Sequence, residues 1–154
     1  CELINNRVLL TGILAWTIGQ FLKFPLDYLL NKQWNWDILL SPGGMPSSHS
    51  ALVTSVTISI GLYQGFGSPL FALSFAVAMI VVYDAAGVRR QAGIHAQRIN
   101  ELMKTFLETR HFPEDELKEV IGHTPFEVIT GILLGALIAL IVYWFLPFNP
   151  GTAC

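Results

Sequence analysis

The chain has 154 residues, the length of one domain, and its composition is unusual for a soluble protein. Hydrophobic residues make up 53% and charged residues 13%, against roughly 25% charged residues in an average globular domain. No Asp, Glu, Lys or Arg occurs from Ile38 to Tyr83 or from Val128 to the end. The net charge of −2, without a basic tract, gives no reason to expect a nucleic-acid partner. We therefore predict an integral membrane protein.

Four apolar segments follow one another along the chain, and they predict transmembrane helices near 8–24, 47–66, 68–84 and 126–148. The two middle segments are marginal in length, because a full span needs about 20 residues. Glycines and a proline between them, within 64–69, are typical of a tight turn. These two segments are expected to form a helical hairpin.

Residues 87–122 differ in character, because they hold 12 of the 20 charged residues of the chain. Residues 91–109 have the pattern of an amphipathic helix, and the Pro-Glu-Asp-Glu sequence at 113–116 resembles a helix start. This segment is predicted to be a polar helical excursion outside the membrane. The predicted fold is an all-α membrane bundle of about four transmembrane helices, with residues 1–154 forming a single domain.

The basic residues predict how the chain is oriented. With four spans, eight of the nine Lys and Arg lie on the side of the polar excursion, and only Arg7 lies opposite. The positive-inside rule predicts that the side with eight Lys and Arg residues faces the cytoplasm and that both termini lie on the other side.

Cys1 and Cys154 stand at the two ends of the sequence, a spacing that matches neither a disulfide framework nor a metal site. No other cluster has the pattern of metal ligands. We predict a site that uses no metal and no cofactor.

Polar residues from four separate segments are expected at the same side of the membrane. Ionisable residues at the ends of membrane helices indicate a functional site. The candidates are Lys23, Ser47, Ser48, His49, Asp84, Arg89, Arg90, His123 and Glu127.

The segment Gly43–His49 combines the features of an anion-binding helix start. Its glycines allow close backbone approach, and Pro46 suits a first turn. Ser47 and Ser48 can cap the helix, whose free N–H groups face an anion. His49 could then donate a proton to a leaving oxygen. An ordinary capped helix entering the bilayer is the alternative.

His123 precedes the last apolar segment, with Glu127 four residues later. Glu127 could hold one imidazole nitrogen and leave the other free to attack a substrate. Because Pro125 disfavours helical geometry at Thr124, His123 is expected outside the regular helix. The alternative is an acid that only stabilises the helix dipole. Gly131 and Gly135 predict close helix packing.

Positive charge for a phosphoryl group could come from three residues. Arg89 and Arg90 are adjacent and are candidate donors to phosphate oxygens, although either could simply anchor a helix end. Lys23 is the third candidate, with a lysine that extends its side chain to the membrane surface as the alternative. Asp84 could orient an arginine or only end its span.

These residues resemble a known superfamily. Residues 46–49, Pro-Ser-Ser-His, resemble the Pro-Ser-Gly-His element of the type 2 phosphatidic acid phosphatases and vanadium haloperoxidases. Residues 123–135 are similar to their His-x3-Asp-Val-x2-Gly-x3-Gly element. The stretches 43–51, 83–90 and 122–125 together look like the divergent branch of this superfamily, which consists of small phosphatase-related membrane proteins. The resemblance to this branch covers nearly the whole chain.

The resemblance implies a role for each matching position. His123 would be the nucleophile that forms a phosphohistidine, Glu127 would orient it, and His49 would be the general acid. Ser47, Ser48 and the adjacent backbone would bind phosphate oxygens. The superfamily's phosphatases use no metal for this reaction.

The chain also departs from the superfamily's pattern. Ser48 replaces a glycine and Glu127 replaces an aspartate. The usual lysine element ending in Arg-Pro is absent, because Leu30 stands seven residues after Lys23. The usual arginine six residues before the nucleophile is replaced by Leu117. Phosphate binding must therefore use other basic residues, or the activity is changed.

The leading hypothesis is a phosphatase acting on a membrane lipid phosphate, such as phosphatidic acid, phosphatidylglycerophosphate or a polyprenyl phosphate or diphosphate. The second is a non-enzymatic lipid-phosphate binder, carrier or sensor that keeps the phosphate site without turnover. A third is a channel or transporter, which would need a homo-oligomer because four spans enclose little pore.

Overall fold

The computed structural model describes residues 5–32, 44–107 and 124–146. These residues form helices and no strand, which confirms the predicted all-α fold. The helices are α2 (Arg7–Asn31), α3 (Ser48–Gln64), α4 (Pro69–Ala86), α5 (Val88–Leu107) and α6 (Pro125–Phe145). Several expectations fall outside the described residues, namely those on Gly43, the segment 108–122, His123, and the two terminal cysteines.

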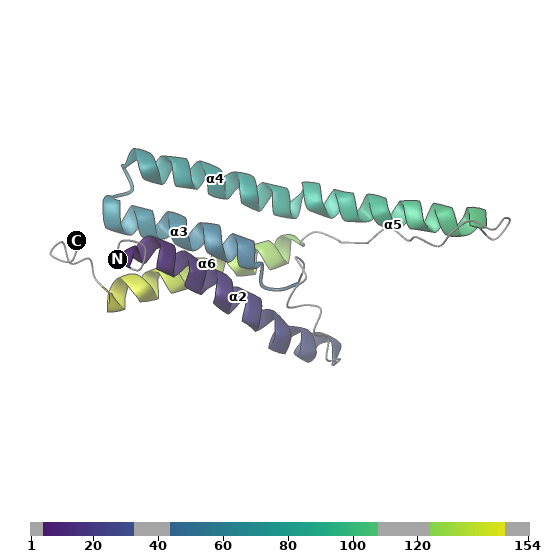
Figure 1. The fold of residues 1–154 in the computed structure, drawn as a ribbon, viewed down its shortest axis with the longest axis horizontal. Coiled ribbons are helices and arrows are strands. Elements are labelled where there is room, and N and C mark those ends of the chain that lie inside the picture. Colours follow the sequence, from purple (N-terminus) through teal and green to yellow (C-terminus); the bar gives the residue numbers. More distant parts are fainter. Residues whose placement is uncertain (1–4, 33–43, 108–123, 147–154) are drawn as a thin grey trace.

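Helix α3 is the centre of the bundle. It packs against α2, α4 and α6, whereas α2 and α4 do not contact each other in the described part of the chain. Helices α2 and α4 run antiparallel to α3, whereas α6 runs parallel to it, so the N-termini of α3 and α6 lie at the same end as the C-termini of α2 and α4 (Figure 1). We call this the site end of the bundle.

Three helices are long and apolar enough to cross a membrane: α2, α4 and α6. The remaining predicted span, 47–66, corresponds to α3, which has 17 residues and is about 26 Å long at 1.5 Å per residue. Six Ser and Thr residues lower its hydropathy, and most of them are buried against the neighbouring helices. The chain is an all-α membrane bundle in which α3, the least apolar of the four bundle helices, occupies the interior.

Small residues bring the backbones of three helices close together. A Cβ atom added at Gly131 would collide with the carbonyl oxygen of Ser47, and one at Gly135 with that of Ala51. On the other side of α3, a Cβ at Gly19 would lie 3.2 Å from the Cα of Ser48. The predicted role of Gly131 and Gly135 in close packing is confirmed, and their packing partner is the first turn of α3.

Helix α2 extends seven residues beyond the expected end at residue 24. Pro25 lies inside it, and the helix ends where Lys32 adopts a left-handed conformation at φ 53°. Proline is tolerated within membrane helices because neighbouring groups satisfy the freed backbone. Lys23 is consequently two turns inside the helix rather than at its end.

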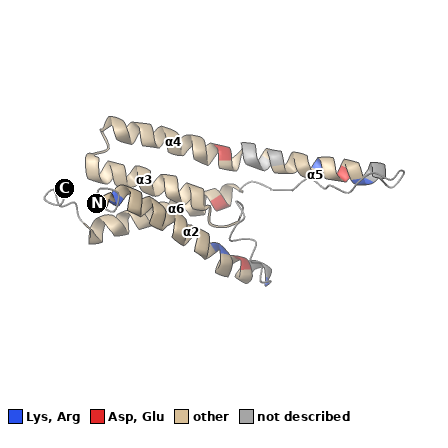
Figure 2. Cartoon of the chain, in the orientation of Figure 1, with Lys and Arg blue, Asp and Glu red and all other residues tan. Residues whose placement is uncertain are grey.

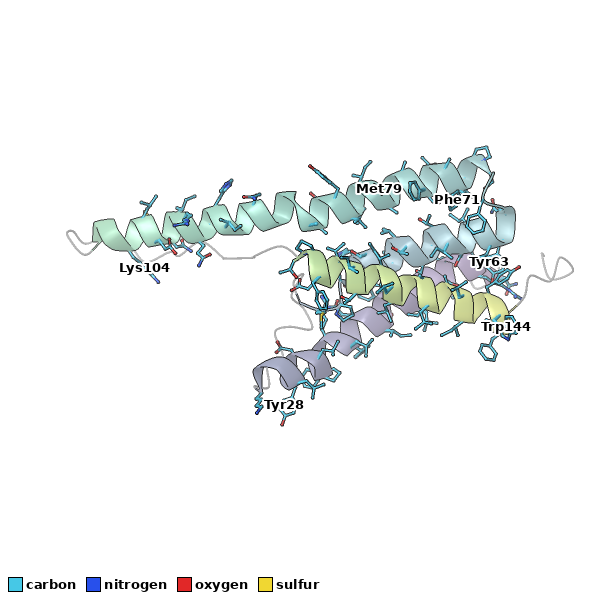
Figure 3. All side chains as sticks on the ribbon, turned by 180° about the vertical axis from the view of Figure 1, so that it is seen from behind. Tyr28, Tyr63, Phe71, Met79, Lys104 and Trp144 are labelled. Carbon is cyan, nitrogen blue, oxygen red and sulfur yellow. The ribbon has the colours of Figure 1, made fainter. Side chains whose placement is uncertain are left out.

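The opposite end of the bundle is held by hydrogen bonds to one carbonyl oxygen. The Leu146 carbonyl accepts a hydrogen bond from the Arg7 guanidinium and another from the Tyr63 hydroxyl at 3.2 Å. The Tyr63 ring also packs edge-on against Tyr143, with centroids 5.3 Å apart. Tyr63 lies at the end of the bundle away from Tyr28 of α2 (Figure 3). These contacts fasten the N-terminus of α2 and the C-termini of α3 and α6 together.

Helix α5 continues beyond the bundle from the C-terminus of α4, with Gly87 between the two helices (Figure 1). It corresponds to the amphipathic helix expected over residues 91–109. The charged residues of the described chain lie mainly at the site end and along α5, whereas Arg7 lies at the opposite end (Figure 2).

Candidate functional site

The first turn of α3 forms the centre of the candidate site. Ser47 is the N-cap, and its Oγ accepts hydrogen bonds from the backbone N–H of Ser50 at 3.3 Å and from the Ser50 hydroxyl at 3.0 Å. The Ser47 backbone N–H donates to the Glu127 carbonyl at 3.0 Å. This last bond joins the start of α3 to the first turn of α6.

Ser48 has a different environment from Ser47. Its side chain is 1% exposed, and its Oγ has no hydrogen-bond partner among the described residues. A buried hydroxyl without a partner is unfavourable, because its lost bonds to water are not replaced. The N-terminus of α3 therefore carries a buried hydroxyl that makes no hydrogen bond to the described residues.

Lys23 is buried beside this helix start. It belongs to a stripe of buried residues spaced four apart on α2, with Ala15 and Gly19 before it. Gly19 lies against Ser48, so Lys23 is one helical turn further toward the site end. The side chain is 1% exposed, which excludes the alternative of a lysine extended to the membrane surface.

Glu127 attracts Lys23 electrostatically from α6. Its Oε2 accepts a hydrogen bond from the Thr124 backbone N–H at 3.2 Å, while the Thr124 hydroxyl accepts one from the Glu127 N–H at 3.3 Å. This reciprocal pair is a capping box. Glu127 thus helps to cap the N-terminus of α6. A bond to His123 is not tested, because His123 lies outside the described residues; α6 begins two residues after it, at Pro125.

His49 is half-buried in the first turn of α3. It follows Ser48, which lies against Gly19 of α2, and precedes Ser50, which lies against Gly131 of α6. Its side chain therefore leaves α3 in a direction between those of Ser48 and Ser50.

Arg89 and Arg90 lie in the first turn of α5, immediately beyond the C-terminus of α4. Their backbone is therefore at the site end of the bundle, while their side chains lie outside the described part of the structure. Asp84 is half-buried near the end of α4. Among the candidates with described side chains, the structure brings Lys23, Ser47, Ser48 and Glu127 together.

Ser50 was not among the predicted site residues, although it is buried and bonded to Ser47. The signal was present in the sequence, because a serine three residues after an N-cap serine is placed to bond with it. Gly19 was missed as well. Its role depends on which helix lies against Ser48, and spacing along the chain does not reveal that.

Comparison with known proteins places these features in a family. The family model described as "Divergent PAP2 family" matches residues 4–138. The protein named "Uncharacterized membrane protein YuiD" of Bacillus subtilis (strain 168) is 39% identical over 155 residues, covering 94% of this chain and 98% of the relative. No solved structure matches the chain at a significant level.

Proposed function

Because the chain belongs to the Divergent PAP2 family, we propose that it is a membrane phosphatase that hydrolyses a phosphate monoester or diphosphate headgroup of a lipid. The candidate substrates are phosphatidic acid, phosphatidylglycerophosphate and polyprenyl phosphates or diphosphates. The observation that carries the proposal is the buried pair of Lys23 and the unpartnered Ser48 hydroxyl at the N-terminus of α3.

A phosphate group would satisfy both of these side chains. A buried ammonium group is costly without an anion close to it, and a phosphate oxygen would provide one in addition to Glu127. The Ser48 hydroxyl would donate to a second oxygen. The positive end of the helix dipole at the start of α3 favours the same ligand. Arg89 and Arg90 follow α4 at this end and would add charge around the phosphate.

The proposed reaction has two steps. A nitrogen of His123 attacks phosphorus, the bond from phosphorus to the leaving oxygen breaks, and that oxygen takes a proton from His49. Water then gives a proton to His49 and attacks the phosphohistidine, the bond from phosphorus to nitrogen breaks, and inorganic phosphate and free His123 result. Glu127 would hold the second nitrogen of His123 with the carboxylate oxygen that is not used by Thr124. The chemistry requires no metal or cofactor.

A lipid substrate suits the position of these residues in the bundle. They lie at the site end of a bundle in which three helices, α2, α4 and α6, are apolar enough to cross a membrane. A headgroup could reach Lys23 and Ser48 while its hydrocarbon tail stays in the bilayer. A water-soluble phosphate ester would gain nothing from this position.

His123→Ala in the full chain, purified in lipid nanodiscs, tests the proposal. We expect loss of phosphate release from every lipid phosphate that the wild type hydrolyses. His95→Ala is the matched control, because His95 is exposed on α5 and has no part in the mechanism. Full activity of His123→Ala would exclude the phosphohistidine mechanism.

A non-enzymatic lipid-phosphate binder is the second candidate. It is favoured by the capping box, in which Glu127 already has a role that requires no catalysis. Rapid quenching with a substrate labelled in its phosphate separates the two. A phosphatase accumulates acid-labile phosphate on His123, whereas a binder retains the lipid and carries no covalent label.

A further inference from the structure

The hairpin of α3 and α4 has a register that fixes which residues lie at the same level. The Thr57 hydroxyl of α3 donates a hydrogen bond to the Ser74 carbonyl of α4 at 3.2 Å. The two helices are joined by a short turn and run antiparallel (Figure 1). Residues nearer the site end than this bond therefore have lower numbers in α3 and higher numbers in α4.

His49 and Asp84 lie at nearly the same height above this bond. His49 is eight residues before Thr57, which is about 12 Å along the axis at 1.5 Å per residue. Asp84 is ten residues after Ser74, about 15 Å along the axis. The difference of about 3 Å is less than one helical turn.

The two residues also lie on the same flank of the hairpin. At about 100° per residue, eight residues back along α3 amount to two full turns and about 80° more. Ten residues forward along α4 fall about 80° short of three full turns. Because the helices are antiparallel, both rotations lead to the same side, so His49 and Asp84 project side by side.

This flank is the one between α2 and α4, two helices that do not contact each other. Helix α6 lies elsewhere around α3, against Ser47 and Ser50. Both His49 and Asp84 are half-buried there, and each has an interaction partner in the structure.

Other acidic residues in the described structure are less well placed to accept a hydrogen bond from His49. Glu127 lies on α6, and Asp27 is eight residues beyond Gly19 on α2, about 12 Å past the level of Ser48. The other charged residues within 5–32, 44–107 and 124–146 at this end are basic: Lys23 and Lys32 on α2, and Arg89 and Arg90 at the start of α5.

We propose that Asp84 is the positioning residue of His49. Its carboxylate accepts a hydrogen bond from one imidazole nitrogen, which fixes the ring and leaves the other N–H to deliver a proton to the leaving oxygen. The inference rests on the proposed function and adds to it a second carboxylate–histidine pair, separate from Glu127 and His123.

The geometry is tested without any assay of activity. Cys1 and Cys154 are replaced by Ser, and His49→Cys is combined with Asp84→Cys in the full chain. A short rigid bismaleimide should link the two cysteines, as detected by mass spectrometry of the digested protein. The matched control combines His49→Cys with Tyr83→Cys, because Tyr83 is at the same level but 76% exposed on another face of α4. Equal linking in both pairs contradicts the proposed flank.

The catalytic role is tested with two leaving groups. A lipid alkoxide such as that of dioctanoyl phosphatidic acid needs a proton on departure, whereas nitrophenolate does not. Asp84→Asn should lower kcat on the lipid about 10- to 100-fold and change kcat on nitrophenyl phosphate less than about threefold, with KM unchanged on both. Asp84→Glu should retain more lipid activity than Asp84→Asn.

His49→Ala should show the same selectivity for leaving groups, and adding Asp84→Asn to it should cause no further loss. An equal loss on both substrates, or additive losses in the double variant, overturns the inference. The proposed function fails separately, through an active His123→Ala variant. Linked cysteines with a fully active Asp84→Asn variant would overturn the positioning role alone.

Discussion

Ser48 and Ser59 are two buried serines of the same helix whose hydroxyls have no hydrogen-bond partner in the described structure. They differ in position: Ser48 begins α3 at the site end, and Ser59 is about three turns further along. Since neither hydroxyl is satisfied, neither contributes to stability through a hydrogen bond. Only the one at the helix start is placed to meet a phosphate.

Ser48→Ala and Ser59→Ala should therefore have the same effect on stability, but only Ser48→Ala should affect function. Removing an unsatisfied hydroxyl should leave the free energy of unfolding unchanged or raise it by up to about 1 kcal/mol in both variants. Ser48→Ala alone should raise KM for the lipid phosphate. Thermal unfolding and steady-state kinetics in nanodiscs measure the two effects, and a raised KM in Ser59→Ala would contradict this assignment.

A substitution at Lys23 provides a second test of the proposed phosphate site. Lys23→Met keeps the length of the side chain and removes its charge, which removes the desolvation cost of the buried ammonium group but also takes the attractive charge away from Glu127. We expect a folded protein with a KM for lipid phosphate raised about tenfold or more. Lys32→Met is the control, because Lys32 is exposed at the end of α2. A Lys23→Met protein that fails to fold would instead make Lys23 a structural partner of Glu127.

The sequence pointed to Lys23 and Ser48 as candidates but not to their surroundings. Hydropathy suggested that Lys23 closed its span, whereas the helix continues through Pro25 to Asn31. The burial of Lys23 arises from the small residue one turn before it, which lets α3 approach. Such burial depends on contacts between helices, so it cannot be predicted from the residue pattern within one segment.

At the scale of elements, hydropathy and the positions of glycine, proline and capping residues predicted most of the helices and their ends. The tight turn predicted after α3 ends at Ser68, which caps α4, and Pro125 begins α6. These features are local and can be recognised from residue types. The identity of α3 as the central helix was not predictable, because its serines and threonines resemble those of a weak span until the neighbouring helices are known.

Gly131→Ala tests the contact between α3 and α6. The added Cβ meets the Ser47 carbonyl oxygen, which is backbone and cannot rotate away. Such overpacking costs about 1–3 kcal/mol and outweighs the gain of up to about 1 kcal/mol in helix propensity. We expect a lower melting temperature and lower activity, since Ser47 is displaced. Gly67→Ala should change neither property, because a Cβ at Gly67 would meet nothing within 4 Å.

At the scale of the whole molecule, the distribution of charge predicts the orientation in the membrane. By the positive-inside rule, we predict that the site end and α5 lie in the cytoplasm and the turn between α3 and α4 lies on the other side. In intact cells, a membrane-impermeant maleimide should label Gly67→Cys, whereas Gln97→Cys on α5 should react only after permeabilisation. Cys1 and Cys154 are replaced by Ser in both variants. The reverse pattern of labelling would invert the topology.

The hydroxyl-rich interior helix also bears on how the protein is made. Helix α3 gains little from contact with lipid, because its six Ser and Thr side chains reduce the benefit of transfer out of water. Helix α4 is strongly apolar and follows after a turn of only a few residues. During biogenesis, α3 is therefore expected to enter the bilayer together with α4 rather than alone. The final docking of α2 and α6 around this pair would then complete the site only after the last span has been synthesised.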